Sequence, residues 1–213
     1  MRSLTTALLA LFLVLPTLAA AQAPTRETAL AALRSPDPGE RQRGAVWLAQ
    51  LGGMDDVPVL LAKLRDPDEA VREIAERAIW VLWSKSGDPQ TDALFRTGIA
   101  QINAGELKEG IVTFTRVIER APDFAEGWNK RATLYFLVGD FERSLKDCDE
   151  VIKRNPNHFG VLAGYGQIYA NLNEYEKALD YFKRALAVNP NLDGVEFQMR
   201  LLERVLADRD KKK

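Results

Sequence analysis

The sequence predicts an all-α solenoid in which helical hairpins stack along the chain. Three prolines recur at equal intervals, at Pro122, Pro156 and Pro190, and residues 26–88 carry a second pattern with a slightly shorter step. A fixed period of roughly 20–50 residues is the signature of a stacked repeat array. The composition, 46 % hydrophobic and 28 % charged, is that of a globular protein. A formal net charge of -1 offers no general basic surface, so nucleic acid is not expected as a partner.

Residues 1–21 have the pattern of a secretory signal peptide. A positively charged start is followed by a Leu-rich apolar run at 4–18 and by three alanines that end at Ala21. We predict cleavage between Ala21 and Gln22, and therefore an exported protein of the bacterial periplasm. An uncleaved membrane anchor is the alternative, but the most apolar stretch, 7–15, is shorter than the roughly 20 residues of a spanning helix. After cleavage we expect no association with the membrane.

Residues 22–88 are predicted to form two helical hairpins. The segment 33–37 is echoed by the segment 64–68. In each copy a proline, Pro36 or Pro67, cannot continue the first helix, and the aspartate that follows favours the start of a longer second helix. Each copy is therefore expected to be one helix, a tight turn and a second, amphipathic helix.

The second of these copies resembles HEAT repeats of the lyase-associated type, on the pattern Val71, Arg72, Ala75 and Ala78. The first copy departs from this pattern, since glutamate and glycine stand where valine and alanine are expected. The resemblance implies stacked hairpins but no chemistry of its own.

Trp80 and Trp83 lie three residues apart, on nearly one face of the last helix predicted in 22–88. We interpret them as large side chains that fill the join between hairpins, because tryptophan is highly buried on average. A ligand-stacking site is the alternative.

The polar stretch 84–89 is predicted to be a connector. It is too short for a free linker, so we expect the two halves to form one continuous rod.

Residues 89–190 contain three helix-turn-helix units in the register 91–124, 125–158 and 159–192. The middle unit places a tryptophan, a small residue, a tyrosine, a glycine and a proline at fixed positions: Trp128, Ala132, Tyr135, Gly139 and Pro156. In this register the stretch resembles the tetratricopeptide repeat, or TPR. The resemblance implies a right-handed superhelical α-solenoid, composed of two HEAT-like hairpins, three TPR units and a C-terminal capping helix.

The ends of the helices in this array are also marked. Gly105, Gly139 and Asn173 stand where the first helix of each unit should stop, because these residue types adopt the left-handed conformation that ends a helix. Residues 191–207 are predicted to be the capping helix, which covers the last repeat and presents polar residues outward. The tail, 208–213, is charged throughout and is expected to be frayed.

The resemblance to TPR proteins implies a concave groove that binds a peptide or a partner protein. In that family the groove is lined by the second, fifth, ninth, twelfth and thirteenth residues of each unit. Carried over to this chain, the candidate residues are Asp92, Phe95, Ile99, Ile102, Asn103, Glu126, Asn129, Thr133, Phe136, Leu137, Gly160, Ala163, Gln167, Ala170 and Asn171. Packing of Phe95, Ile99 and Phe136 against the N-terminal half or the cap stays open as an alternative.

A carboxylate clamp for a chaperone C-terminus is not expected in this groove. The resemblance places the lysine and asparagine of such a clamp at Phe95 and Ile99, and its later cations at Gly160 and Gly164. A hydrophobic or mixed peptide is therefore the expected ligand.

Gly160 and Gly164 also predict a soft helix, because each interior glycine lowers helix stability by about 1 kcal/mol relative to alanine. Neutral drift is the alternative explanation for these glycines.

No motif for catalysis, for a cofactor or for a metal is recognised. The single histidine, His158, lies beside a turn without a nucleophile motif, and the single cysteine, Cys148, is expected to be a small buried hydrophobe. We therefore expect a non-enzymatic protein with no cofactor. It is predicted to be an exported scaffold or adapter that binds a partner protein or an extended peptide in the TPR groove.

Two alternative functions stay open. One is a self-associating structural component of an envelope assembly, which is a homo-oligomer. The other is a non-catalytic accessory subunit of an envelope enzyme.

Overall fold

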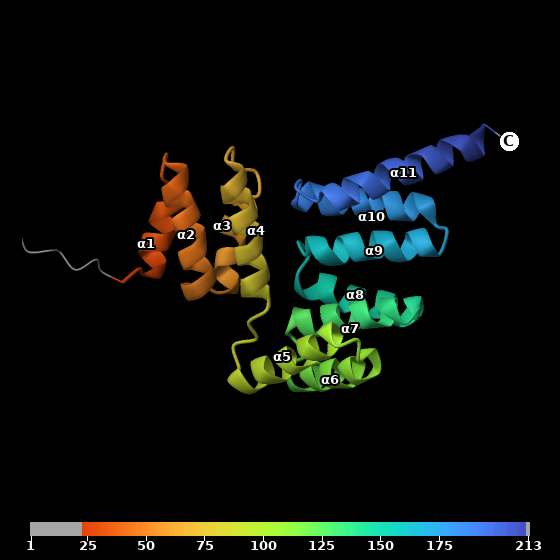
Figure 1. Ribbon diagram of the computed structural model, residues 1–213, viewed down its shortest axis with the longest axis horizontal. Helices are drawn as coiled ribbons and strands as arrows, with labels where there is room; N and C mark the ends of the chain where they lie inside the picture. The colour runs from red at the N-terminus through yellow and green to blue at the C-terminus, as the bar shows by residue number, and fades with distance from the viewer. Residues whose placement is uncertain (1–22, 212–213) are drawn as a thin grey trace, which may run out of the picture.

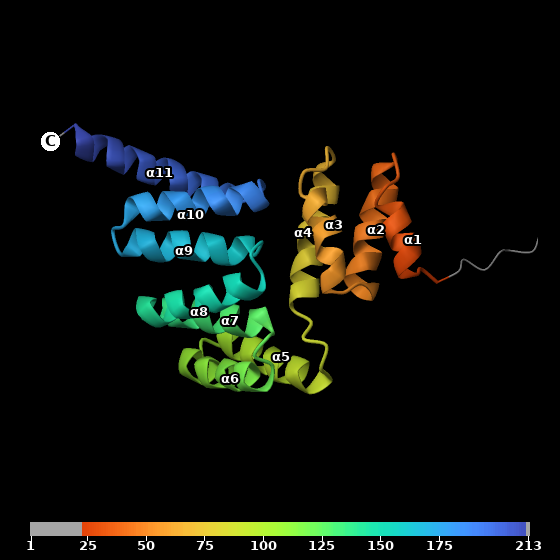
Figure 2. The same cartoon turned by 180° about the vertical axis from the view of Figure 1, so that it is seen from behind.

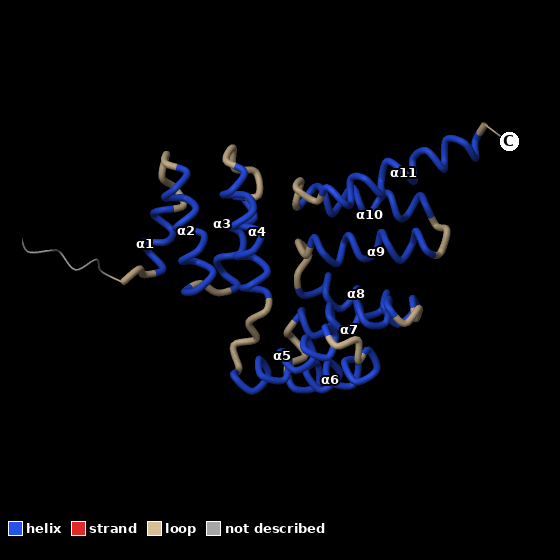
Figure 3. Tube along the Cα trace, viewed as in Figure 1, coloured by secondary structure: helices blue, strands red, loops and turns tan. Residues whose placement is uncertain are grey.

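The computed structural model describes residues 23–211, and this part of the chain is all-helical, with no β-strand (Figures 1 and 3). The predicted signal peptide, with its cleavage site at Ala21 and Gln22, lies outside the described residues, as do the last two residues of the charged tail. Among the helices of 23–211, none is long and apolar enough to cross a membrane.

The N-terminal half consists of two helical hairpins. The first pairs α1 (Arg26–Ala32) with α2 (Pro38–Leu51), and the second pairs α3 (Val57–Lys63) with α4 (Glu69–Trp83), after a short 3-10 helix, η1 (Met54–Asp56). Asp37 and Asp68 cap α2 and α4, since their carboxylates accept backbone N–H groups at 3.1 and 2.9 Å. The proline–aspartate turns therefore start these helices in the predicted way.

One arginine of each hairpin ties it to the element that follows. Arg41 donates to both carboxylate oxygens of Asp66 in the next hairpin, at 2.9 and 2.7 Å, and to two carbonyls of its own turn. Arg72, at the equivalent position of the second hairpin, makes the same carbonyl contacts, but its other partner is Asn191 Oδ1, at 3.0 Å. A turn of the C-terminal half thus takes the place that a third hairpin would occupy.

The C-terminal half is an array of three hairpins and a last helix. Its elements are α5 (Pro89–Asn103), α6 (Leu107–Arg120), α7 (Ala125–Leu137), α8 (Phe141–Arg154), α9 (Phe159–Asn171), α10 (Tyr175–Val188) and α11 (Asp193–Asp210). Gly105, Gly139 and Asn173 have φ values of 75, 80 and 60°, which confirms that they end the first helix of each unit.

The repeat period of the array reflects close packing of the two helices within a unit. A Cβ atom added to Gly98 would lie 2.6 Å from the Phe114 ring, and one added to Gly166 would lie 2.3 Å from the Phe182 ring. The small residue of the first helix therefore makes room for the aromatic residue of the second. Phe114 and Phe182 are fully buried as a result.

The two halves do not form one continuous rod, and that expectation is wrong. Figures 1 and 2 show α1 to α4 standing beside the array, roughly across its helices, rather than stacked on its end. The connector after α4, with Gly87 at φ 83°, leads to α5 at the end of the array far from α11. The array then runs back along α4.

An aromatic cluster joins α4 to the array. The Trp83 ring stacks on the His158 ring with centroids 4.2 Å apart, and Trp80 meets Phe159 edge-on at 5.3 Å. Both tryptophans fill a join, but it is the join between the halves rather than between two hairpins. Burial of these rings against the side of the array is the physical reason for the bent arrangement.

The last helix covers the end of the array on one face only. Val195 and Leu202 pack into the neighbouring hydrophobic core. Outside this core contact Phe197, Leu201 and Val205, spaced by four residues, are 56, 43 and 46 % exposed. The cap therefore presents apolar side chains outward in addition to the predicted polar ones, such as Arg200 and Glu203.

Candidate functional site

Two adjoining cavities lie along the first helices of the repeat units. The smaller one, of about 130 Å³, lies between α7 and α9, and the larger one, of about 430 Å³, lies between α9 and α11. They share Phe136 and Gln167 in their walls. Together they form one surface depression, which we call the α7–α11 groove.

Several predicted groove residues meet in this depression. The members that line it are Asn129, Thr133, Phe136, Gly160, Gln167, Ala170 and Asn171. Leu137, at the end of α7, is 51 % exposed. These seven residues belong to the second and third units, and their role in binding stays a prediction.

Phe95 and its neighbours in the first unit do not reach the α7–α11 groove. Phe95 is only 5 % exposed and packs edge-on against Phe114 and Phe124, with centroids 5.6 and 5.3 Å apart. Ile99 and Ile102 pack against the same cluster. These residues form the core of their own unit, so the alternative of packing against the N-terminal half or the cap is wrong for Phe95.

The polar candidates of the first unit also lie apart from the groove. Asp92 accepts hydrogen bonds from the backbone N–H and the hydroxyl of Ser86, at 2.8 and 2.6 Å, and so fixes the connector to α5. Asn103 is exposed at the end of α5. Neither residue lines either cavity of the α7–α11 groove.

Glu126 and Ala163 are closed to a ligand in the groove, since they are 1 and 9 % exposed. Glu126 instead accepts a hydrogen bond from His158 Nε2 at 2.6 Å. The other ring nitrogen, Nδ1, accepts the backbone N–H of Val161 at 3.1 Å and so caps α9.

The Glu126 carboxylate is charged despite its burial. Burial by itself would raise its pKa, but the hydrogen bond from His158, the ammonium of Lys130 and the amide of Asn129 lower the pKa to about 2. Four contacts therefore saturate this carboxylate: one from His158, two from Asn129 and an ion pair with Lys130 at 3.3 Å. The Glu126–His158 pair holds two turns of the array together.

Residues that the TPR register did not include complete the α7–α11 groove. Gln198, Leu201 and Leu202 of α11 form one wall. Gly164 lies where the other units have Lys130 and Arg96, and a Cβ atom added there would meet nothing within 4 Å. The replacement of a long cation by glycine, visible in the repeat alignment, is the signal that could have identified this opening.

Gly160 has a different role from Gly164. A Cβ atom on Gly160 would lie 2.5 Å from Trp80 Cη2, so this glycine makes room for the ring that docks α4 on the array. The sequence predicts that the two glycines soften α9, with drift as the alternative. The structure instead gives Gly160 a packing reason and leaves Gly164 beside open space.

The walls of the α7–α11 groove are neutral. Over residues 23–211, no charged side chain lines either cavity, and the polar groups are amides and hydroxyls.

Cys148 lies at the bottom, 3 % exposed, as predicted for a buried hydrophobe. Burial, with Asp147 and Asp149 nearby, raises the pKa of its thiol to about 12, so the thiol stays protonated. Among the described residues, no group of three His, Cys, Asp or Glu could hold a metal ion.

Stacked helical hairpins with a neutral groove along their first helices define a helical-repeat protein of the interaction class. The tetratricopeptide repeat pattern matches residues 92–123, 125–158 and 166–192. A TPR repeat-containing protein of Rhizobium etli is 30 % identical over 154 residues, which are 72 % of this chain and 74 % of that protein. The chain belongs to the tetratricopeptide repeat family.

Two more comparisons place the array among TPR domains. Hsp70-Hsp90 organizing protein 1 of Glycine max is 26 % identical over 143 residues, which are 65 % of this chain but only 24 % of that protein. The first TPR domain of Spaghetti (RPAP3), solved with the HSP90 peptide SRMEEVD, aligns with a TM-score of 0.54 at 23 % identity, over 56 % of this chain and 96 % of that domain. At this level of identity the structural likeness shows the shared fold alone.

Proposed function

We propose that the protein is a scaffold that holds an extended, uncharged segment of a partner protein in the α7–α11 groove. The observation that carries this proposal is the neutral lining of the groove, in which apolar side chains alternate with amides. Phe136, Ala170 and Leu201 offer apolar contact, while Gln167 and Gln198 can donate to and accept from a peptide backbone. No catalytic step is proposed for this site.

An acidic C-terminal peptide of the kind seen with the RPAP3 domain does not suit this groove. The clamp positions hold Phe95 and Ile99 in the core of the first unit, and Gly160 and Gly164 in α9. Lys130, the one cation near a clamp position, pairs with Glu126 and lies over the Trp80 ring. A negatively charged terminus would therefore find no cation to pair with in the groove as formed by residues 23–211.

Selection from a random peptide library against the purified protein tests this function. The variant Gly164→Leu places a side chain in the open space of the groove, and Gly164→Ala is the matched control that adds a single methyl group. We expect enriched peptides to be apolar and uncharged, and to bind Gly164→Leu at least about tenfold more weakly, the effect of filling an apolar pocket. Enrichment of acidic peptides, or equal binding to both variants, contradicts the proposal.

Export of this scaffold is a further part of the proposal, and its support is the pattern of residues 1–21. The intact mass of the protein recovered from the envelope of the producing bacterium tests it. A chain that starts at Gln22 is the expected result, and retention of residue 1 contradicts it.

A self-associating component is the second candidate function. The exposed row of Phe197, Leu201 and Val205 on α11 is the observation that favours it, because apolar rows of this kind often mark contact surfaces. A second copy of the chain that packs on this row would remove its apolar side chains from water.

A further inference from the structure

The exposed apolar residues of α11 stand at the repeat positions that line the α7–α11 groove one unit earlier. Leu201 follows Gln167 by one repeat period, and Val205 follows Asn171 by the same step. Both earlier residues line the groove. Phe197 lies one helical turn before Leu201 on the same face of α11. We call Phe197, Leu201 and Val205 the α11 row.

Leu201 joins the α11 row to the groove. Its side chain lines the larger cavity together with Phe136 and Ala170. The other two members of the row lie four residues to either side of Leu201, so they flank the point at which the cavity meets α11. The α11 row therefore continues the apolar part of the groove wall.

The face of α11 that a further second helix would cover is charged. Arg200 stands one repeat period after Gly166, the small residue that makes room for the Phe182 ring. Arg200 is exposed and pairs with the exposed Glu196 at 2.6 Å. A long charged side chain at this position leaves no room for an aromatic partner, and no helix follows α11 within residues 23–211. This charged face ends the array.

The α11 row, by contrast, is not needed to end the array. Polar side chains in its place would leave the contacts of Val195 and Leu202 with the neighbouring core unchanged. Arg204, which follows Ala170 by one repeat period, lines neither cavity of the groove. An exposed apolar row beside a neutral groove is typical of a contact surface, and the matching occupant is apolar.

The spacing of the α11 row indicates how a segment lies on it. Consecutive members rise about 6 Å along the helix axis, so the two gaps between them are also about 6 Å apart. In an extended chain, side chains two residues apart point to the same side and lie about 6–7 Å apart. Two apolar side chains separated by one residue therefore fit the two gaps.

We propose that one end of the partner segment held in the α7–α11 groove lies along α11 and places two bulky apolar side chains, separated by one residue, on either side of Leu201. This inference rests on the proposed scaffold function and specifies its partner. The partner is an extended, uncharged segment that ends in such an apolar pair. A second copy of the chain is the competing occupant of the α11 row.

A phage-displayed library of random dodecapeptides is the probe. It is selected in parallel against the purified natural protein and against the double variant Phe197→Ser, Val205→Ser. Both substituted side chains are half-exposed, so the variant keeps its fold, which urea unfolding checks. We expect the natural protein to enrich peptides with two bulky apolar residues one residue apart. Synthetic copies of these peptides should bind the double variant at least about tenfold more weakly.

The matched control is Arg200→Ser, Glu203→Ser, which changes the charged face of the same helix and should bind the synthetic peptides normally. Gly164→Leu separates this inference from the proposed function, because Gly164 lines the smaller cavity, between α7 and α9. Weak binding to Gly164→Leu with normal binding to the double variant overturns the contact on α11 and leaves the scaffold function standing. Normal binding to both overturns both.

Two further results would also overturn the contact on α11. One is enrichment of peptides that lack the apolar pair. The other is a double variant that binds the synthetic peptides normally but, in light scattering, self-associates less than the natural protein. That result assigns the α11 row to a second copy of the chain.

Discussion

At the residue scale, the role of a side chain in this array depends on contacts that the repeat register does not specify. Gly160 and Gly164 lie one helical turn apart, yet one makes room for Trp80 and the other leaves a space open to solvent. The same holds for Asn155 and Asn189, which occupy equivalent turns but differ in whether α4 supplies an acceptor. Equivalent positions of a repeat therefore acquire different roles from their neighbours.

Glu126 gives a prediction for the dependence of stability on pH. Its pKa is about 2 in the folded protein, below the ordinary value of 4.5, so the folded state binds this proton less tightly than the unfolded chain does. Its contribution to the free energy of unfolding is therefore complete above about pH 4.5 and is lost as the pH falls toward 2. We expect Glu126→Gln to be less stable than the natural protein at pH 7.

Urea unfolding at pH 7, 5 and 3.5 measures this effect. The difference in the free energy of unfolding between the two proteins should narrow between pH 5 and 3.5, because the unfolded chain of the natural protein takes up the proton in this range. Lys146→Gln removes an exposed charge and serves as a control with a small, nearly constant difference. A difference for Glu126→Gln that does not change with pH contradicts the assignment.

At the element scale, α11 has two apolar faces, of which one is covered and the other exposed. One face, with Val195 and Leu202, covers the end of the array, and the other, with Phe197 and Val205, is exposed. The helical spacing of the first face was visible in the sequence. The exposed face could not be distinguished from the covered one in the sequence. Periodicity shows which residues share a face of a helix, but not which face packs against a neighbouring helix.

The double variant Phe197→Ser, Val205→Ser tests whether the exposed face joins two copies of the chain. We expect its free energy of unfolding to change by less than about 1 kcal/mol, since both side chains are half-exposed. If the protein self-associates, light scattering over a range of concentrations should show that the variant does so less. Val195→Ser, on the covered face, should instead lose stability. Oligomers that persist in the double variant contradict a role for this face.

At the scale of the whole molecule, the hydrophobic core of the N-terminal hairpins extends into the array. That core extends from Ala29 and Leu60 to Phe159, Val188 and Leu192. The hairpins and the array were predictable from their two repeat periods, because local spacing determines which residues face each other in a hairpin. Their relative position was not, because contacts such as that between Leu64 and Asn191 span 127 residues and belong to no period.

Removal of Trp83 should separate the two halves. Trp83→Ala deletes a nearly fully buried ring at the junction, and such deletions cost about 3–5 kcal/mol. We expect unfolding in two steps and a larger radius of gyration in small-angle X-ray scattering. Trp128→Ala, within the array, should lose stability without expansion of the molecule. A compact Trp83→Ala variant with a single transition would show that the polar contacts alone hold the halves together.

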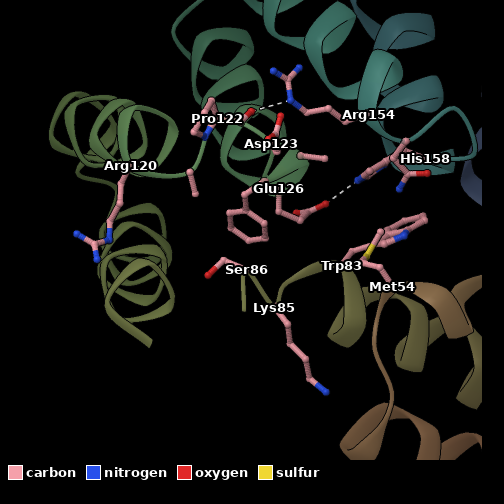
Figure 4. Close-up of a pocket in the computed structure, with 14 residues that line it drawn as sticks. Met54, Trp83, Lys85, Ser86, Arg120, Pro122, Asp123, Glu126, Arg154 and His158 are labelled. Atoms are coloured by element: carbon pink, nitrogen blue, oxygen red, sulfur yellow. Dashed lines mark hydrogen bonds and ion pairs between the residues drawn. The ribbon is translucent and has the colours of Figure 1, made fainter. Parts of the chain in front are cut away.

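The candidate site was predicted only in part, because the repeat register determines some of its residues and not others. The register identified Phe136, Gln167 and Asn171 because the position of these side chains in the groove follows from the repeat alone. It also selected Phe95, whose ring was needed for the core of its own unit. It missed the cavity of about 440 Å³ between the end of α4 and the turns before α7 and α9 (Figure 4), because no single repeat contains all of these elements.

The contact between Arg72 and Asn191 also determines in which direction the protein can be lengthened. A duplicated hairpin inserted after α4 would move the turn at 189–191 out of reach of Arg72. A duplicate placed ahead of α1 would leave this contact and the α7–α11 groove intact. Its arginine would face Ser35, which stands where the next unit has Asp66, so Ser35→Asp would restore the paired contact that Arg41 makes.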